Sequence, residues 1–451
     1  MTSLKEFFKP FQRFSLHNIN ASALLFTAAI LAMFLANSPW AYFYEDFLYR
    51  HVFFQIGDFN IFSHHGESMT VLAFVNDALM SLFFLLVGME IKQEILIGEL
   101  SSVRKAVFPI VAAFGGMIVP VLVFLIFCST TPDIRGAAIP MATDIAFALS
   151  VLALLGNRVP LSLKIFLTAL AVVDDIGGII IIALFYSGHV AVIPLLLSIL
   201  VLFTLYLAGK FRINSNAFYY IGGFIVWLLF LESGIHPTIA GVLVAFTIPA
   251  RPIVQLEGFV DKLSQSLKAL PLSEGERSPK ATVLSNAQIH ILRRIEATSD
   301  KVISPLQNMT DSLHPYVNYL ILPLFAFVNA GVTFGSIKLD MLMGIPMGVF
   351  AGLFIGKTVG IFSFSYLFVK SGIGHYPLGM NTKNLFALSM LGGIGFTVSL
   401  FIANLSYSGV PEIGANLLNQ AKLGVFAGSF ISGVLGYFRL KQVLPPAEVK
   451  Q

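Results

Sequence analysis

The sequence predicts an all-α protein that crosses a lipid bilayer about twelve times. Three observations predict this fold class: the composition, a series of long apolar runs, and an uneven distribution of basic residues among the loops. Apolar residues make up 56% of the 451 residues and charged residues only 12%, whereas a soluble domain has about 25% charged residues. The mean hydropathy of +0.83 implies more apolar surface than a soluble protein hides, but a bilayer can host it.

Each apolar run approaches the length of about 20 residues that a helix needs to cross the hydrocarbon core. The runs cover residues 18–38, 70–89, 106–129, 136–156, 162–187, 191–209, 216–231, 235–249, 316–334, 344–369, 384–406 and 420–438. We therefore expect a single membrane domain over residues 1–451. Lys5, Lys9 and Arg13 precede the first run, which we interpret as an uncleaved span.

The loops on the two sides of these runs differ in charge. One set is rich in lysine and arginine, as at Arg104–Lys105, Lys210 and Arg212, while the other set is poor in them. Because basic loops stay in the cytoplasm, we expect an even number of spans with both termini in the cytoplasm. This topology explains the net charge of +4, so nucleic acid is not an expected partner.

Two loops differ from the rest. Residues 51–63 carry β-type side chains around Gly57–Asp58, which predicts a short hairpin on the outer side. Residues 251–303 are polar and predict a cytoplasmic loop insertion with some helix. The single cysteine, Cys128, lies in an apolar run, so an intrachain disulfide is excluded.

Ionisable residues inside membrane spans cost about 3 kcal/mol each on insertion scales, so they are candidates for function. In this chain they are Asp77, Asp144, Asp174, Asp175 and Lys357, with Glu90, His236 and Lys422 near span ends. Asp77 is typical of a structural hydrogen-bonding acid, and Lys422 of an anchor at the membrane surface.

The adjacent pair Asp174–Asp175 is the strongest candidate. Neighbouring helical residues point about 100° apart, so both carboxylates reach one polar cavity without sharing a narrow stripe. Two buried carboxylates this close do not both ionise readily. A small hard cation such as Na⁺ or Li⁺ favours their charged forms and displaces protons, so the pair predicts competition between a cation and protons. The alternative is a structural pair satisfied by hydrogen bonds or a salt bridge.

The first predicted helix break lies next to another acid. Pro140 removes a helical hydrogen bond and disfavours helix at Ile139. A break there exposes backbone groups beside Thr143 and Asp144, which is tolerated only in a cavity or inside the protein. The alternative is an ordinary proline kink with Asp144 in a salt bridge.

A second break is predicted in the other half of the chain. Gly392, Gly393 and Gly395 interrupt an apolar run, although glycine also serves close helix packing. Paired interruptions in corresponding halves point to a transporter site. We therefore expect core repeats at about 106–187 and 344–438, each with an interrupted middle helix.

Lys357 lies in mid-span and needs a carboxylate partner, for which Asp174 or Asp175 is the natural choice. It is either part of a structural ion pair or a proton carrier. Glu90 and Glu94 lie where a span leaves the membrane. They form either a solvated helix end or an acidic funnel that attracts cations and senses pH.

Five motifs that contain these residues resemble the NhaA Na⁺/H⁺ antiporters of bacterial inner membranes. They are Asn76-Asp-Ala-Leu-Met, Ile139-Pro-Met-Ala-Thr-Asp-Ile-Ala-Phe, Leu170-Ala-Val-Val-Asp-Asp-Ile-Gly, Ile321-Leu-Pro-Leu-Phe-Ala-Phe-Val-Asn-Ala-Gly and Gly393-Ile-Gly-Phe-Thr. The similarity covers nearly the whole chain except about 251–303. The motifs are long and therefore specific.

The resemblance implies a fold of twelve helices, built as inverted repeats with two crossed interrupted helices. It implies electrogenic, pH-regulated exchange of two protons for one Na⁺ or Li⁺ by alternating access, without a cofactor and without enzymatic activity. It also implies that the hairpin at 51–63 lies in the periplasm and joins a homodimer in the inner membrane.

The resemblance also assigns roles to single residues. Asp174 and Asp175 match the pair that binds the cation and protons. We assign Asp175 as the more essential ligand and Asp174 as the partner of Lys357. Thr143 and Asp144 match residues of the interrupted helix that support the site. Lys357 matches a lysine that pairs with the first aspartate and balances helix ends. The residues that match positions linked to pH response are Glu90, Glu94 and His236.

The chain departs from the family pattern at two positions. Thr310 stands where many members have an acidic residue, and Thr358 stands where proline is expected. Another proton- or cation-coupled secondary transporter is the alternative function. An intramembrane aspartyl protease would need a Gly-x-Gly-Asp motif, which the sequence lacks. A cation channel would need a repeated filter loop, and a mid-span lysine opposes cation flow.

Overall fold

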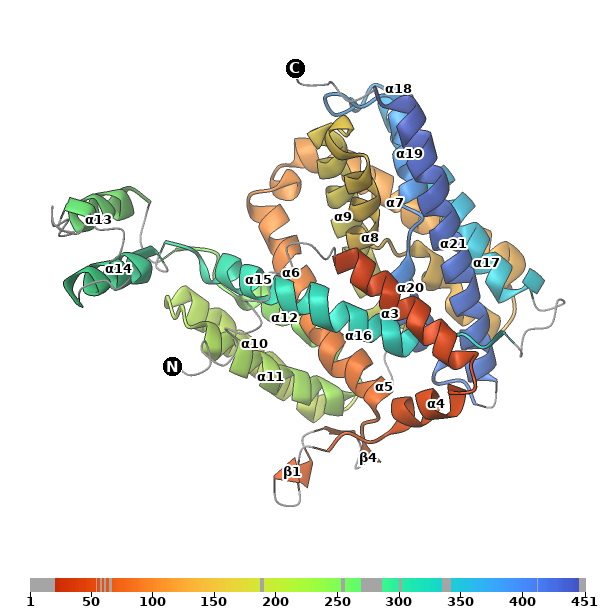
Figure 1. The fold of residues 1–451 in the computed structure, drawn as a ribbon, viewed down its shortest axis with the longest axis horizontal. Helices are drawn as coiled ribbons and strands as arrows, with labels where there is room; N and C mark the ends of the chain where they lie inside the picture. The colour runs from red at the N-terminus through yellow and green to blue at the C-terminus, as the bar shows by residue number, and fades with distance from the viewer. Residues whose placement is uncertain are drawn as a thin grey trace, which may run out of the picture.

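The computed structural model describes residues 21–53, 55–56, 59–60, 62–64, 67–186, 190–252, 256–268, 286–299, 302–334, 342–411 and 413–445. Within these residues, seven helices are long and apolar enough to cross a membrane. Three further pairs of bent helices pass the same test when each pair is taken together. The chain is therefore a helical multi-pass membrane protein, as the composition predicts (Figure 1).

Two of the seven uninterrupted spans change helical type along their length. One begins with α5 (Val71–Ala73) and the π-helical turn η1 (Phe74–Leu79) and continues as α6 (Met80–Leu96). Another joins α17 (Ile345–Ala351), η8 (Gly352–Gly356) and α18 (Lys357–Lys370). The others are α7 (Val103–Phe127), α9 (Leu161–Phe185), α10 (Val192–Lys210), α11 (Asn216–Ser233) and α21 (Gly414–Val443).

Two of the predicted spans correspond to helices that are neither among the seven long apolar helices nor among the three bent pairs. The run 235–249 contains α12 (Thr238–Thr247), which is apolar but only 10 residues long. The run 316–334 corresponds to a helix that starts earlier, as α15 (Pro305–Tyr316), and continues through η5 (Val317–Ile321) and α16 (Leu322–Asn329). Ser304 caps this helix by accepting a hydrogen bond from the Gln307 amide.

Two of the bent pairs are broken inside the bundle. The helix η3 (Asp133–Met141) meets α8 (Ile145–Leu154) at 43°, and α19 (Thr382–Leu391) meets α20 (Phe396–Tyr407) at 48°. The breaks lie next to Pro140 and at the glycines 392–395, where the sequence places them. The two breaks touch, because the amide of Asp144 donates to the carbonyl of Ile394 over 2.6 Å.

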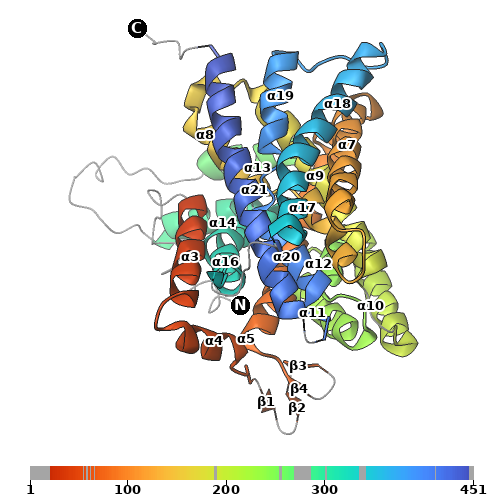
Figure 2. The ribbon, with the colours of Figure 1, turned by 90° about the vertical axis from the view of Figure 1, so that its right-hand side faces the viewer.

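The third bent pair lies at the N-terminal side. The helix α3 (Ala21–Ala36) is followed by α4 (Ala41–Tyr49), which turns away by 114°. Four short strands come next: β1 (Gln55–Ile56), β2 (Phe59–Asn60), β3 (Ser63–His64) and β4 (Glu67–Ser68). β1 pairs with β2 and β3 with β4, both antiparallel. They lie together at one end of the molecule (Figure 2). Residues 54, 57, 58 and 61 of the predicted hairpin are outside the described part.

Glycines allow two helix pairs to approach closely. A Cβ atom on Gly115 of α7 would lie 2.2 Å from the carbonyl oxygen of Gly360 on α18. A Cβ atom on Gly241 of α12 would lie 2.2 Å from the carbonyl oxygen of Ser81 on α6. Lipid supplies no hydrophobic drive for helix association, so such backbone-to-backbone packing holds a membrane bundle together.

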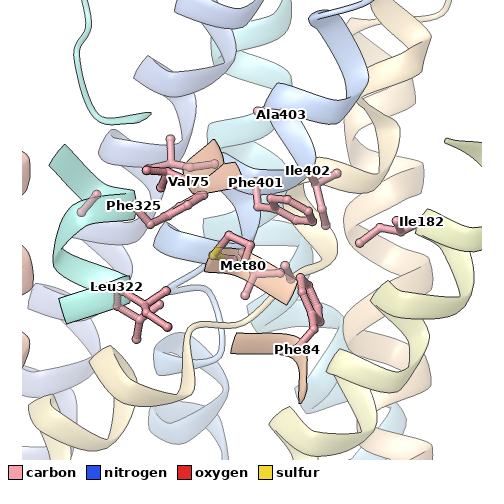
Figure 3. Packing of buried hydrophobic residues seen from close by; sticks show 14 of the residues in the cluster. Val75, Met80, Phe84, Ile182, Leu322, Phe325, Phe401, Ile402 and Ala403 are labelled. Atoms are coloured by element: carbon pink, nitrogen blue, oxygen red, sulfur yellow. The ribbon is translucent and has the colours of Figure 1, made fainter. Parts of the chain in front are cut away.

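An apolar layer fills the middle of the bundle. Its side chains come from η1 and α6, from α16, from α20 and from α9, and Figure 3 labels Val75, Met80, Phe84, Leu322, Phe325, Phe401, Ile402 and Ile182 among them. The rings of Phe84 and Phe401 lie 5.4 Å apart. One of the helices that contribute to this layer, α9, also carries the two aspartates described below.

The predicted insertion 251–303 contains two helices. They are α13 (Leu256–Lys268) and α14 (Asn286–Ser299), which pack against each other. Figure 1 shows both standing away from the bundle. Residues 253–255, 269–285 and 300–301 of this segment lie outside the described residues.

Candidate functional site

The two adjacent aspartates lie on the uninterrupted helix α9 and are both buried, with exposed fractions of 2% for Asp174 and 8% for Asp175. They have different neighbours because adjacent helical residues point about 100° apart. Asp175 lines a cavity of about 720 Å³, while Asp174 faces Lys357. Asp174 is therefore part of an ion pair, and Asp175 is part of the cavity wall.

Asp174, Lys357 and Thr143 form a closed triangle of contacts. The ammonium group of Lys357, which is fully buried, makes an ion pair with Oδ2 of Asp174. It also donates to the hydroxyl of Thr143 over 2.7 Å. That hydroxyl lies 2.7 Å from the same Oδ2 atom. Since a buried charge needs a partner, each of these two side chains supplies the partner that the other needs.

One oxygen of Asp174 has no such partner. Among the described residues, Oδ1 is a buried acceptor without a hydrogen bond. A buried acceptor of this kind costs roughly 1–3 kcal/mol. A proton or a cation at this oxygen would not have to replace an existing hydrogen bond.

Thr143 connects this triangle to the second helix break. Its hydroxyl also lies 2.9 Å from the carbonyl oxygen of Gly392. A hydroxyl has one proton to donate, so at any moment Thr143 donates either to Asp174 or to Gly392. A change in the charge of Asp174 would therefore change which of these two hydrogen bonds Thr143 donates. This determines whether the Gly392 carbonyl, at the break between α19 and α20, accepts one.

Asp144 caps two helices at once. Its Oδ1 accepts from the amide of Phe147 over 3.0 Å, which caps the N-terminus of α8. Its Oδ2 accepts from the amide and the hydroxyl of Thr397, over 3.1 and 2.7 Å, at the start of α20. A carboxylate is favoured at a helix N-terminus, where backbone N–H groups are unpaired. Asp144 therefore stabilises both breaks, and its oxygens are already occupied.

The cavity runs from Asp175 toward the C-terminal end of α6. Its lining includes Asp144, Thr143, Glu90 and Glu94. Carboxylates on a concave wall raise the local concentration of cations. Within the described residues, no three His, Cys, Asp or Glu side chains cluster tightly enough to form a metal centre. A cation at Asp175 would therefore complete its shell with hydroxyl, carbonyl or water oxygens.

A histidine that the sequence analysis did not select lies on this cavity. His314 of α15 makes an ion pair with Glu90 over 2.9 Å and lines the cavity. It precedes the predicted span 316–334. The hydrogen bond that His314 donates to Glu90 raises the pKa of His314 above its usual value, against the opposing effect of burial. Glu90 was selected because it lies at the end of a predicted span. The same criterion would have selected His314, which lies next to the start of one.

The remaining predicted site residues lie apart from the aspartate pair. Glu94 accepts from the backbone amide of Glu99 over 2.8 Å, at the end of α6. His236 lies 3.6 Å from Asp77 and 2.8 Å from the hydroxyl of Thr238. It does not line the cavity that Asp175 lines. The structure therefore separates His236 from the other predicted site residues.

The two departures from the family pattern also have visible partners. Thr310 accepts a hydrogen bond from the Gln93 side chain over 2.9 Å. This neutral contact joins α15 to α6. Thr358 donates its hydroxyl to the carbonyl of Phe354, four residues earlier. Such a bond bends a helix slightly, and here it lies where the π-helical turn η8 passes into α18 beside Lys357.

Comparison of the sequence with known proteins shows which family it resembles. Residues 12–440 match the model of the family described as Na⁺/H⁺ antiporter 1. The chain is 64% identical to the Na⁺/H⁺ antiporter NhaA of Parabacteroides distasonis, with 98% of each chain covered. It is 53% identical to the NhaA of Bacteroides fragilis, over 96% of this chain and 97% of that one. It is 43% identical to the NhaA of Proteus mirabilis, with 95% of each chain covered.

Proposed function

The chain belongs to the Na⁺/H⁺ antiporter 1 family, and we propose that Asp174 and Asp175 are the groups at which a sodium ion and protons compete. The protein is a Na⁺/H⁺ antiporter, a transporter that uses no cofactor and is not an enzyme. Its transported substrates are Na⁺ and H⁺, and Li⁺ is expected to replace Na⁺ because it is also a small hard cation.

The observation that carries the proposal is the split between the two aspartates. Asp175 lies on the cavity wall, where a cation or a proton reaches it from solution. Asp174 is tied to Lys357 and keeps one oxygen without a hydrogen bond. A sodium ion binds to Asp175 and to Oδ1 of Asp174, and its charge displaces the protons that otherwise sit there.

Lys357 and Asp144 balance charge around this exchange. When protons occupy the aspartates, the Lys357 ammonium turns to the carbonyl ends at the breaks, with Thr143 as its nearest hydroxyl. Asp144 keeps the N-termini of α8 and α20 neutralised throughout. Exchange of two protons for one Na⁺ makes the transport electrogenic, since net charge then crosses the membrane.

The topology proposed for the chain has twelve spans. The helix α12 and the predicted span 316–334, which contains η5 and α16, join the ten spans that length and composition support. The repeats 106–187 and 344–438 are related as inverted repeats, and their interrupted helices cross at the contact between Asp144 and Ile394.

The orientation follows from charge. Both termini and residues 251–303 lie in the cytoplasm of a bacterium, and the protein lies in the inner membrane, because basic loops stay inside. The cavity then opens to the cytoplasm beside Glu94. The alternating-access cycle therefore starts, in this structure, from a state open to the cytoplasm. A homodimer forms through residues 51–63 in the periplasm.

Regulation by pH is proposed for the mouth of the cavity. Glu90 and Glu94 attract cations there, and the ion pair between Glu90 and His314 breaks as the pH rises. His236, which lies apart with Asp77, senses the pH of another region.

The test is replacement of Asp175 by Asn, which keeps the shape but removes the charge. Everted vesicles are loaded with an acid-quenched dye, and Na⁺, Li⁺ or K⁺ is added between pH 6 and 9. We expect the parent to release protons on addition of Na⁺ or Li⁺ and Asp175→Asn to release none. Glu296→Gln on the exposed side of α14 is the control. Full Na⁺-dependent proton release by Asp175→Asn would overturn the mechanism, and release with K⁺ alone would favour another cation-coupled transporter.

A further inference from the structure

The short helix α4 leaves the membrane-spanning helix α3 at a steep angle. The bend of 114° between them turns the chain sideways after Ala36. α4 has nine residues, a length of about 14 Å. A helix of this length that leaves a span sideways does not cross the bilayer. It lies along the membrane surface.

Helical geometry divides α4 into three faces, since each residue turns the helix by about 100°. Tyr44 is buried and Ala41 and Leu48 are half-buried, so this face packs on the protein. Phe43 and Phe47 form a second face, which Trp40 extends just before the helix. The third face carries the polar and tyrosine side chains Tyr42, Glu45, Asp46, Tyr49 and Arg50.

The second face is apolar and largely exposed, although the ring of Phe47 also meets that of Phe327 edge-on at 6.2 Å. The exposed fractions are 55% for Trp40, 66% for Phe43 and 43% for Phe47. Exposure of such rings to water costs about 25 cal/mol per Å². The face is continuous with the outer side of α3, because the ring of Trp40 meets that of Phe34 edge-on at 6.4 Å. Phe34 is 59% exposed on a helix that spans the membrane, so its surroundings are lipid.

We propose that α4 is an interfacial helix whose apolar face, Trp40, Phe43 and Phe47, inserts into the boundary between lipid headgroups and acyl chains. Tryptophan and tyrosine favour this boundary, and amphipathic helices bury an apolar face there to a depth of about 5–10 Å. The third face is suited to the headgroups and water, since Arg50 and Asp46 form an exposed ion pair at 2.7 Å. The partner is the lipid surface of the leaflet opposite to the cavity mouth.

The buried face of α4 and the turn before it connect the helix to the end of α16. The hydroxyl of Tyr44 donates to the carbonyl of Phe327 over 2.7 Å, near the C-terminal end of α16. Asn37, between α3 and α4, donates to the carbonyl of Val332 over 2.6 Å and accepts from the amide of Phe334. Figure 2 shows α4 beneath the ends of α3 and α16. An α4 held in the interface therefore holds the end of α16 at a fixed depth.

Tryptophan fluorescence tests the proposal directly. The chain has two tryptophans, and the other, Trp227, is buried. Trp227→Phe leaves Trp40 as the only reporter in the full-length protein. We reconstitute this variant in vesicles whose lipids carry bromine at a shallow, middle or deep position of the acyl chain. We expect Trp40 to be quenched most by the shallow bromine, at every lipid-to-protein ratio.

Other patterns of quenching would overturn the proposal. Strongest quenching by the deep bromine would make α4 part of a span, and absence of quenching would place it in water. Quenching that appears only at high lipid-to-protein ratio would mean that a second copy of the chain covers the face.

Matched double variants separate the two exposed faces of α4. Phe43→Ser with Phe47→Ser removes two rings from the apolar face, and Tyr42→Ser with Tyr49→Ser removes two from the polar face. All four side chains are exposed, and Phe47 also touches the ring of Phe327 on α16. We expect the first pair to shift Trp40 emission to the red with loss of most quenching, and the second pair to leave both unchanged. Equal changes in Trp40 emission and quenching for the two double variants would overturn the assignment of the apolar face to the lipid.

A second measurement keeps the proposal testable if Trp227→Phe does not fold. A spin label is attached to Phe43→Cys or to Tyr42→Cys, since the native Cys128 is buried and escapes labelling. We expect the label at 43 to collide more with oxygen, which partitions into lipid, and the label at 42 to collide more with a water-soluble nickel complex. The reverse order would overturn the proposal.

Discussion

Two neighbouring carboxylates on one helix have different surroundings, and this difference begins with the rotation of α9 by about 100° between Asp174 and Asp175. One side of α9 faces α7 and α18, which carry no acid there but do carry Lys357. The other side faces the cavity. At the scale of single residues, the site is an ion pair with one unused oxygen next to a carboxylate that solution can reach.

Removal of Lys357 should destabilise the protein strongly. Lys357→Met leaves the Asp174 carboxylate buried without a counter-charge, which costs about 3–5 kcal/mol. The double variant Lys357→Met with Asp174→Asn removes both charges and should recover most of that loss. Thermal unfolding of the purified protein measures each variant. Lys383→Met, on an exposed side chain, is the control, and a double variant as unstable as Lys357→Met would contradict the ion-pair interpretation.

His314 should set part of the pH dependence. The hydrogen bond to Glu90 raises the pKa of His314. The stabilising contribution of this ion pair is therefore complete below pH about 6.5, the ordinary pKa of histidine. It is lost as the pH rises through the raised pKa. His314→Gln removes the positive charge at the cavity mouth at every pH. We expect its antiport to begin at a lower pH than in the parent.

The measurement is the initial rate of Na⁺-driven proton release from everted vesicles in steps of pH. His290→Gln is the matched control, because His290 is exposed on α14, apart from the residues that line the cavity. An onset that stays where it is in the parent would show that the pair between Glu90 and His314 has no part in regulation.

At the scale of helices, glycines determine how closely α7 and α18 approach, and thereby where Lys357 reaches. Gly360→Ala places a methyl group about where the Gly115 carbonyl lies, 2.1 Å from the ideal Cβ position. Overpacking of this kind costs about 1–3 kcal/mol. We expect a lower unfolding temperature and slower antiport, because α18 carries Lys357 away from Asp174.

The control for this prediction is Gly178→Ala on α9. An ideal Cβ atom at Gly178 meets no atom within 4 Å, and alanine favours helix over glycine by about 1 kcal/mol. Gly178→Ala should therefore be neutral or slightly stabilising in the same unfolding measurement. If both variants unfold alike, close packing at Gly115 and Gly360 does not hold the two helices.

At the scale of the whole molecule, we infer that two successive layers close the bundle on the side of the site away from the cavity mouth. The first is the apolar layer of Figure 3. The second consists of three buried amides, of which Asn329 of α16 pairs with Asn76 of η1 over 2.8 Å and accepts from Asn404 of α20 over 3.1 Å. Because α20 belongs to an interrupted helix, the amide contacts link the site to helices outside the two repeats.

Asn404→Ala should weaken this closure. It removes the bond from α20 but leaves Asn76 and Asn329 paired, so the state open to the opposite side becomes more populated. We expect the apparent KM for Na⁺ at the cavity side to rise roughly fivefold, the equivalent of one net hydrogen bond of about 1 kcal/mol. Proton release from everted and right-side-out vesicles gives KM at the two sides.

The control for Asn404→Ala is Asn308→Ala. Asn308 makes an amide contact of the same kind with Asn216, over 3.3 Å, between α15 and α11. It lies outside the two layers. Its removal should change neither KM. A rise in KM for both variants would mean that any lost amide contact slows the protein, and the closure would need another explanation.

The sequence by itself determined what depends on one stretch of chain. Hydropathy and loop charge located the membrane helices, and Pro140 and the glycines at 392–395 located both breaks, because a missing hydrogen bond or side chain acts on its own neighbours. The cost of a charge in lipid singled out Asp174, Asp175 and Lys357. The resemblance to a known family then attached a chemistry to them.

Only the tertiary structure decided which of these residues meet. Whether Asp174 or Asp175 faces Lys357 depends on how α9 is rotated against α18, and that is decided by side chains and glycines on other helices. The same holds for the pairing of His314 with Glu90, and for the separation of His236 from the site. These contacts join segments far apart in the chain, and packing in three dimensions, which leaves no periodic signal in the sequence, is their physical cause.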